Sequence, residues 1–256
     1  MQTKVCKFLA AALAICCIFP LYTSAKTGAY NWYFSLKNGY PETDSDYAFI
    51  DSYDGYFYNK AANAAKEKVI YLTFDAGYEN GNVERILDTL KKHSASGTFF
   101  VLEHLIANNT DLVMRMVNEG HDVANHTAHH PDMTKKDECG FCDEIKKAET
   151  VFYEKTGKTM AKFYRPPQGR FSKENLKAAK KLGYKTIFWS FAYADWDNDR
   201  QPAADYAYRK ITSATHPGEI ILLHPTSKTN ADILDDLLTF WENEGYRFGK
   251  LSELGE

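Results

Sequence analysis

The sequence predicts an α/β fold, a distorted (β/α)7 barrel preceded by an irregular aromatic arm. From residue 69 onward, short apolar runs alternate with longer segments in which apolar residues recur at helical spacing. Strand and helix alternating in this way indicate a parallel sheet with crossover helices. The count of about seven strands favours a closed or nearly closed barrel. We therefore expect one barrel domain over residues 69–256 and an arm over residues 26–68.

The first 25 residues are organised like a secretory signal peptide. Lys4 and Lys7 precede an uncharged apolar stretch over residues 8–21, and small residues end the segment at Ala25. Because this stretch is shorter than the roughly 20 residues that cross a bilayer comfortably, we expect cleavage near Ala25, with an uncleaved anchor as the alternative. The protein is then exported and works in the cell wall or at the outer face of the membrane.

Aromatic side chains dominate the arm over residues 26–68. They alternate with glycine, asparagine, aspartate and serine, and follow neither a helical nor a strand period. We expect the arm to wrap the barrel and to bury most of its rings against it. Stacking on carbohydrate is the alternative use of these rings.

The barrel elements follow in order from residue 69. The predicted strands cover residues 69–74, 97–102, 121–124, 161–164, 186–189 and 219–223. The predicted helices cover residues 82–93, 111–119, 138–155, 172–182, a stretch around 202–213, and 230–245. In the second of these helices we expect Asp111 to act as the cap and Gly120 to end it.

Ionisable residues stand where the predicted strands end. In such barrels the chemistry lies at the carboxyl ends of the strands. The residues at those ends are Asp75, His126 and His130, Arg165, Asp195 and His224. Five strand ends therefore deliver ionisable side chains to one face, which indicates an active site there.

The segment HTAHH over residues 126–130 is the best candidate for a metal site. Neutral imidazole is the commonest protein ligand for a transition metal, and His126 and His130 on one helical turn would point to the same side. A chance cluster of surface histidines is the alternative.

The ordered motifs of the chain resemble those of the polysaccharide deacetylase (NodB-homology) family, carbohydrate esterase family four. They are TFDAG at residues 73–77, HTAHH at 126–130, RPPQG at 165–169, DW at 195–196 and LLH at 222–224. The likeness covers roughly residue 69 to the C-terminus. YLTFD at 71–75, GYENG at 77–81, HHPDM at 129–133 and the arm around Trp32 are similar, more narrowly, to the branch that deacetylates N-acetylmuramic acid for muramic δ-lactam formation in spore cortex peptidoglycan.

The resemblance implies a role for each polar residue at the strand ends. Asp75 would be the general base, and Arg165 would hold it ionised and oriented through a charge-assisted hydrogen bond. His224 would protonate the departing amine, with Asp195 as the partner that favours its imidazolium form. The alternatives without a catalytic role are a turn aspartate for Asp75 and a surface ion pair for Arg165.

The resemblance also implies substrate-binding groups. The backbone N–H of Gln168 occupies the position of the family's oxyanion donor. Trp196 and Leu222 would wall the pocket that accepts the acetyl methyl group, although both could equally be ordinary core residues.

One position departs from the family pattern. Family members place a second aspartate after the base as a third metal ligand, and the muramic branch often has asparagine there, but this chain has Ala76. A divalent ion, zinc or similar, would then be held by His126 and His130 with water, or with a ligand borrowed from His129 or Asn125. We expect weak metal binding, because an anionic ligand is missing.

Composition narrows the choice of partners. The signal segment carries two of the 31 basic residues and none of the 34 acidic ones, so the mature chain has a formal charge of −5. Such a protein is not built to bind nucleic acid phosphates. The two cysteines that follow the signal segment, Cys139 and Cys142, have the spacing of a redox motif or half a zinc site. A local disulfide or two free thiols at a helix start is the simpler interpretation.

These observations favour an exported hydrolase that removes N-acetyl groups from peptidoglycan glycan strands, most specifically from N-acetylmuramic acid on the route to the muramic δ-lactam of spore cortex. Deacetylation of N-acetylglucosamine or another polysaccharide is the first alternative. A non-catalytic glycan-binding module that has lost its metal is the second. We expect a monomer that works together with an N-acetylmuramoyl-L-alanine amidase.

Overall fold

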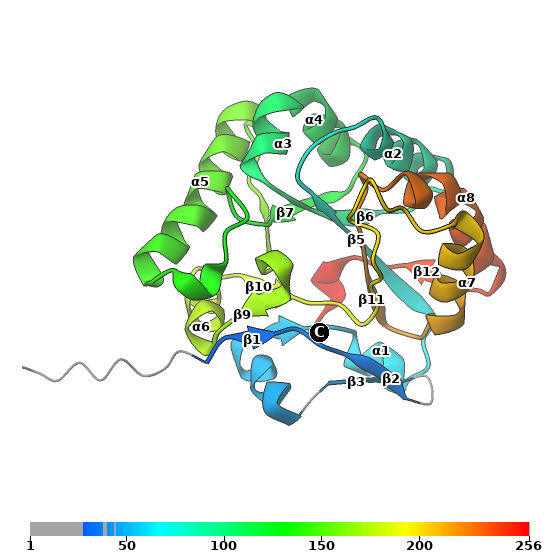
Figure 1. Ribbon diagram of the computed structural model, residues 1–256, viewed down its shortest axis with the longest axis horizontal. Coiled ribbons are helices and arrows are strands. Elements are labelled where there is room, and N and C mark those ends of the chain that lie inside the picture. The colour runs from blue at the N-terminus through cyan, green and yellow to red at the C-terminus, as the bar shows by residue number, and fades with distance from the viewer. Residues whose placement is uncertain (1–27, 38–39, 44, 256) are drawn as a thin grey trace, which may run out of the picture.

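The computed structural model describes residues 28–37, 40–43 and 45–255, and shows a curled parallel sheet wrapped by helices (Figure 1). The predicted signal segment lies outside the described residues. Seven parallel strands follow one another in the order β11 (Glu219–Leu223), β5 (Val69–Ala76), β6 (Gly97–Val101), β7 (Asp122–Asn125), β8 (Ala161–Tyr164), β10 (Lys185–Ile187) and β4 (Gly55–Tyr56). The α/β barrel prediction is confirmed.

Two single bridges join β11, at one edge of the sheet, to the segments that follow β4 and β10 at the other side. Tyr58, just after β4, pairs with Glu219 of β11, and Phe191 pairs with Ile221. β12 (Arg247–Phe248) lies beside the start of β5. The sheet therefore curls into a barrel whose strand ends converge on one face.

Helices cover the outer face of this sheet, with α2 to α5 along one side and α7 and α8 beside β11 (Figure 1). The long helices are α2 (Asn82–Lys92), α4 (Thr110–Asn118), α5 (Glu138–Thr156), α6 (Lys173–Lys181), α7 (Ala204–Ala214) and α8 (Lys228–Asn243). All six were predicted at nearly these bounds. The short helices α1 (Lys60–Ala64) and α3 (Glu103–Asn108) were not.

One helix cap was predicted wrongly. α4 begins at Thr110, and its N-cap is Asn109, so Asp111 lies inside the first turn rather than before it. The predicted stop holds, because Gly120 follows the helix with a φ of 85°, a left-handed conformation that glycine adopts without strain.

Strand β5 shows how the sequence builds two different surfaces. Side chains alternate across a strand, so Ile70, Leu72 and Phe74 join the core between sheet and helices. Val69 and Tyr71 point the other way, into the barrel interior. The interior-facing series then continues with Thr73 and Asp75, so the interior turns polar as the strand reaches its carboxyl end.

The arm is tied to the barrel along its length. β1 (Tyr30–Asn31) pairs antiparallel with β9 (Arg170–Phe171), and β4 supplies the seventh strand of the barrel sheet. β2 (Ser35–Lys37) and β3 (Tyr40–Glu42) form a small hairpin, and a 3-10 helix, η1, spans Ser45–Tyr53. Other short 3-10 turns are η2 (Met133–Lys135), η3 (Pro167–Gly169) and η4 (Leu251–Glu253).

Trp32 is the main anchor of the arm. Its ring stacks on Phe188 with centroids 4.4 Å apart, and its indole N–H donates to the carbonyl of Trp189 at 2.9 Å. Its backbone N–H donates to Gly169 at 2.8 Å. The arm therefore supports the segment that carries the third sequence motif.

None of the helices in the described part of the chain is long and apolar enough to cross a membrane. Cys139 and Cys142 lie in the first turns of α5 as free thiols, the first exposed and the second partly buried.

Candidate active site

An ion pair between Asp75 and Arg165 lies inside the barrel at the carboxyl ends of β5 and β8. Arg165 Nη1 donates to Asp75 Oδ1 at 2.8 Å. Its Nη2 donates to Thr73 Oγ1 at 2.8 Å and its Nε to the carbonyl of Ile187 at 3.1 Å. The guanidinium is fully buried and lies 4.1 Å from the ring of Phe100. This position agrees with the role expected for Arg165 as the residue that orients Asp75.

Asp75 is held in its ionised form. Burial raises the pKa of the carboxyl group. The charges of Arg165, His126 and His224 and the Arg165 hydrogen bond lower this pKa, and together they outweigh burial. The net result is a pKa below the ordinary aspartate value, so the group is a carboxylate across the physiological range. A carboxylate with a free oxygen is what a general base requires.

His126 and His130 converge on Asp75, but not on a helical turn as the sequence suggested. Residues 126–130 form a loop, in which Thr127 and His130 have positive φ angles of 74° and 57°. The two rings nevertheless meet edge to face with centroids 4.9 Å apart. The two imidazoles were predicted to point to the same side of a helical turn. They do lie close together, but the turn is a loop with a left-handed backbone at two positions.

The ring nitrogens of these histidines suit a metal ion. His126 Nδ1 donates to the carbonyl of Arg165 at 2.9 Å, which leaves Nε2 free, 3.5 Å from Asp75 Oδ2. Burial lowers the pKa of His126 to about 4, and it also lowers the pKa of His130. Both histidines favour the neutral form, and the free nitrogen of His126 lies near a carboxylate. Neutral imidazole nitrogens are ligands that a divalent ion accepts.

His129 and Asn125, the residues expected to supply a third metal ligand, have other partners in this geometry. His129 is engaged at both ring nitrogens, by Glu144 and Lys147. Asn125 donates to the carbonyl of Ile145 and accepts from the N–H of Thr127. Within the described residues, no cluster of three or more His, Cys, Asp or Glu side chains could hold a metal ion. In this conformation His129 and Asn125 are therefore occupied by other partners, and a borrowed third ligand stays a prediction.

Ala76 is fully buried at the end of β5. It belongs to the apolar core between sheet and helices, on the same strand face as Phe74. The side chain at this position therefore packs outward from the barrel interior, away from the side that carries Asp75.

His224 and Asp195 form the second buried pair. His224 Nδ1 lies 2.7 Å from Asp195 Oδ1, and the backbone N–H of His224 donates to Oδ2 at 2.8 Å. Burial lowers the pKa of His224, but the hydrogen bond and charge of Asp195 outweigh it, and the pKa lies above the ordinary histidine value. A raised pKa favours the protonated imidazole, which is the form that can act as a general acid.

Two buried residues complete these pairs and were missed in the sequence. Asn230, in the first turn of α8, donates to Asp195 Oδ2 at 2.6 Å and to the carbonyl of His224 at 3.1 Å. Thr73 accepts from Arg165. Thr73 could have been found, because it is a polar residue two positions before Asp75 in an apolar strand and so shares its face. Nothing in the local sequence singles out Asn230.

The expected substrate-binding residues lie in different environments. Gln168 has an exposed side chain and a left-handed backbone at φ 60°. Trp196 is 61% exposed, and its ring lies 6.3 Å from that of His224, so it is not a core residue. Leu222 is buried at the end of β11, two residues before His224. Their roles toward substrate stay predictions.

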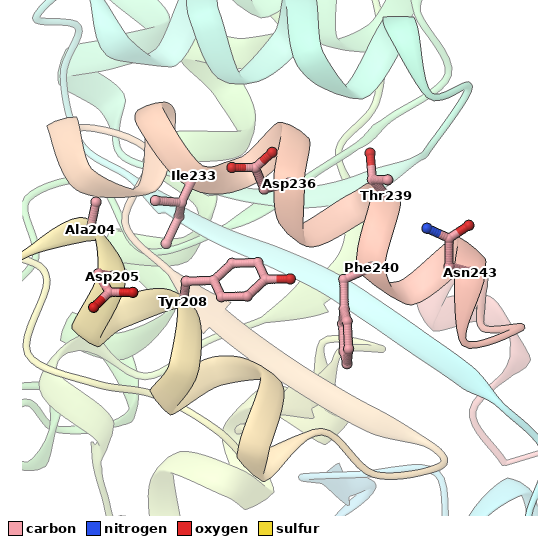
Figure 2. A pocket seen from close by; sticks show the side chains of 8 residues that line it. All are labelled: Ala204, Asp205, Tyr208, Ile233, Asp236, Thr239, Phe240 and Asn243. Atoms are coloured by element: carbon pink, nitrogen blue, oxygen red, sulfur yellow. The ribbon is translucent and has the colours of Figure 1, made fainter.

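A surface pocket of about 460 Å³ lies elsewhere, on the outside of the barrel between α7 and α8. Figure 2 shows Asp205 and Tyr208 of α7 facing Asp236 and Phe240 of α8 across it. None of the catalytic candidates lines this pocket. We therefore locate the candidate active site by the ionisable residues at the strand ends and not by this pocket.

Comparisons with known proteins agree with this geometry. Residues 62–187 match the family model described as polysaccharide deacetylase. The chain is 39% identical over 251 residues to the peptidoglycan-N-acetylmuramic acid deacetylase PdaA of Bacillus subtilis, a match that covers 94% of each chain.

Solved structures have the same fold. The structure of Bacillus subtilis PdaA, a family 4 carbohydrate esterase, matches with a TM-score of 0.83 and 41% identity, over 89% of this chain and 97% of that one. A family pseudoenzyme from Bacillus anthracis, BA3943, matches with a TM-score of 0.67 and 29% identity, over 73% of this chain and 65% of that one.

Proposed function

Because the chain belongs to the polysaccharide deacetylase family, carbohydrate esterase family 4, we propose that it deacetylates N-acetylmuramic acid in peptidoglycan. The observation that carries this proposal is the pairing at one face of an ionised Asp75, held by Arg165, and a His224 that retains its proton beside Asp195. Binding a glycan requires neither a base nor an acid, whereas hydrolysis of its acetamido group requires both.

Each of these residues has a separate proposed role in amide hydrolysis. Asp75 accepts a proton from the attacking water as the water oxygen bonds to the acetyl carbon. His224 gives its proton to the sugar nitrogen as the carbon–nitrogen bond breaks, which releases acetate and a free amine. Arg165 keeps the base ionised and Asp195 keeps the acid protonated. The backbone N–H of Gln168 is proposed to stabilise the negative oxygen of the tetrahedral intermediate.

We propose that His126 and His130 hold a divalent ion, as is general in this family. When bound, such an ion supplies a Lewis acid at the acetyl carbonyl and lowers the pKa of water. Two neutral imidazoles leave its charge uncompensated, so binding is expected to be weak.

Substitution of Ala76 by aspartate tests the cause of weak binding. Because the Ala76 side chain packs away from Asp75, an aspartate there becomes an oxygen ligand only if the end of β5 turns it toward His126 and His130. In that case Ala76→Asp should tighten zinc binding by roughly 10 to 100 fold, since it adds a ligand and a negative charge. Since Ala76 is buried among apolar side chains, the metal-free variant should also melt at a lower temperature, and added zinc should restore it. Calorimetric titration measures the affinity, and His126→Ala should abolish binding in both backgrounds. Equal affinities would show that an aspartate at position 76 does not reach the ion.

Acetate release from purified peptidoglycan tests the enzymatic proposal. Spore cortex is the proposed setting, so glycan strands trimmed by an N-acetylmuramoyl-L-alanine amidase should be better substrates than strands with intact peptide stems. Asp75→Asn should lower the rate by on the order of a hundredfold in a folded protein. Release from chitin oligosaccharides, but not from muramic acid residues, would favour the N-acetylglucosamine alternative.

A second candidate function, glycan binding without catalysis, is favoured by two observations. The chain lacks a carboxylate after Asp75, and it resembles a family pseudoenzyme from Bacillus anthracis. Glycan binding that is unaffected by Asp75→Asn, with no acetate released by either protein, would support it.

We also propose that the protein is exported as a monomer to the cell wall after cleavage near Ala25. Mass spectrometry of the exported protein gives the new N-terminus directly. An intact N-terminus in the membrane fraction would support an anchor instead.

A further inference from the structure

We propose that Glu144 positions the loop that carries the two histidine ligands, and that it does so through His129. This inference rests on the proposed metal site at His126 and His130. His129 lies between the two ligands in sequence, and Glu144 is on α5. In this assignment His129 attaches the loop to α5 and does not bind the ion.

Both oxygens of the Glu144 carboxylate contact His129. Its Oε2 accepts the backbone N–H of His129 at 3.0 Å, and its Oε1 lies 3.0 Å from the ring Nδ1. Glu144 is buried, with 9% of its surface exposed, although it is charged. A buried carboxylate is costly unless its oxygens are hydrogen-bonded, and His129 supplies a bond to each of them.

The other ring nitrogen of His129 is also occupied. Lys147 Nζ lies 3.0 Å from Nε2 and 3.0 Å from Glu103 Oε2. Glu103 Oε2 itself lies 3.3 Å from the same ring nitrogen. Both ring nitrogens of His129 therefore face protein groups, Nδ1 toward Glu144 and Nε2 toward Lys147 and Glu103, and neither faces His126 or His130.

The loop needs such an anchor because its backbone is unusual. Thr127 and His130 both have left-handed φ angles, a conformation that costs non-glycine residues free energy and persists only when the surroundings enforce it. The loop is fixed at its start by Asn125, which donates to the carbonyl of Ile145 on α5, and at its end by the His130 N–H, which donates to Thr127 Oγ1. Glu144 fixes the middle. A site with only two protein ligands depends strongly on their being held in place before the ion binds.

Three variants separate position from charge and from direct ligation. Glu144→Gln cannot accept from both donors of His129. Glu144→Asp keeps the charge but is one methylene too short to reach both. Each should weaken zinc binding in calorimetric titration by about tenfold, the effect usual for partners of metal ligands. His129→Ala keeps the backbone N–H bond to Glu144 Oε2 and loses the ring contacts with Glu144 Oε1 and Lys147. One of the two bonds to the loop therefore remains, and zinc binding should weaken by less than about fivefold.

Glu154→Gln is the matched control, because Glu154 is exposed on the same helix and the change in charge is the same. It should bind zinc like the unsubstituted protein. The metal-free Glu144 variants should remain folded by circular dichroism. In acetate release they should lower kcat and leave KM for the glycan unchanged, because the glycan does not contact Glu144 in this proposal.

The order of the effects decides the proposal. If His129→Ala is more damaging than Glu144→Gln, His129 is itself a ligand and the proposal fails. If Glu144→Asp binds zinc normally while Glu144→Gln does not, the effect is one of charge and the positioning role fails. Absence of zinc binding in the unsubstituted protein would overturn the metal site and, with it, the role of Glu144.

Discussion

Arg165 uses all three of its guanidinium nitrogens, and this makes lysine a poor replacement. They donate to Asp75, to Thr73 and to main-chain carbonyls of Ile187 and Phe188. A lysine has one ammonium group and cannot reproduce this planar set. Arg165→Lys should therefore lower kcat/KM by on the order of a hundredfold, nearly as much as Arg165→Ala. Acetate release from both folded variants gives the comparison, and substantial activity in the lysine variant would reduce the role of Arg165 to simple charge.

The Asp195–His224 pair should determine the alkaline side of the pH–rate profile. Burial alone would lower the pKa of His224, and Asp195 raises it above the ordinary value. Because the protonated imidazole is the active form, the rate should fall as pH rises through this raised pKa. Asp195→Asn removes the charge, so the alkaline fall should move to lower pH and the maximal rate should drop. Profiles of kcat against pH measure the shift, and coincident profiles would show that His224 does not act as the acid.

The site residues could be predicted from sequence to the extent that strand ends reveal them. Asp75, Arg165 and His224 each directly follow a predicted strand, and the structure brings them together. Asn230 was missed because its contact with Asp195 depends on how α8 packs after the turn that follows β11. The tie between His129 and Glu144 was missed for a similar reason, since it joins a loop to a helix 15 residues away.

At the scale of elements, periodicity located the long helices but could not describe the loop at residues 126–130. Two histidines four apart fit a helical turn, yet the loop has positive φ angles at Thr127 and His130. Such angles are enforced by tertiary contacts, here with α5 and Arg165, which no local pattern encodes. α3 escaped prediction because it has only six residues and follows β6 directly.

The arm should matter to the stability of the whole chain, and Trp32 tests this. Its ring is nearly buried, stacks on Phe188 and bonds to Trp189, while its backbone bonds to Gly169. Trp32→Ala should lower the free energy of unfolding by about 3 to 5 kcal/mol, as is usual for a large buried aromatic ring. Activity should fall as well, because Gly169 adjoins Gln168.

Tyr33 is the control for this prediction. It is the next residue and is 64% exposed, so Tyr33→Ala should change the free energy of unfolding by less than about 0.5 kcal/mol. Urea unfolding of the two variants gives both values. A Trp32→Ala protein as stable as Tyr33→Ala would show that the arm is only loosely attached.

At the scale of the whole molecule, alternation of apolar runs and helical segments was enough to predict the barrel. Six of its seven strands were found as apolar runs, because strands of a parallel sheet are buried on both faces. The seventh, β4, has only two residues, Gly55 and Tyr56, and belongs to the arm. Its pairing with β10 is a long-range contact, and two residues are too few to predict it from sequence.

The end of the barrel opposite the catalytic face holds a buried Glu219, which should make the stability of the fold depend on pH. Glu219 begins β11 and is fully buried. Its Oε2 accepts the backbone N–H of His216 at 3.2 Å, and its Oε1 has no hydrogen-bond partner among the described residues. Burial raises the pKa of this carboxyl group from 4.5 to about 8, against the smaller opposing effect of the His216 bond. The folded protein therefore keeps a proton that the unfolded chain releases.

The sign of the effect follows from this difference in proton binding. Below pH 4.5 both states are protonated, and the contribution of Glu219 to stability is complete. As pH rises toward 8 the unfolded chain gains by ionising while the folded protein cannot, so stability is lost, by at most about 1.4 kcal/mol per pH unit. Glu219→Gln has nearly the same shape and never ionises. Its melting temperature should match that of the unsubstituted protein near pH 4.5 and exceed it by several degrees at pH 8, since roughly 1 kcal/mol shifts the melting temperature of a chain of this size by about 2 to 4 °C. Calorimetric scans of both proteins across this range isolate the one group, because every other ionisable residue is shared. Parallel curves would mean that Glu219 is ionised in the folded protein and that its charge is compensated.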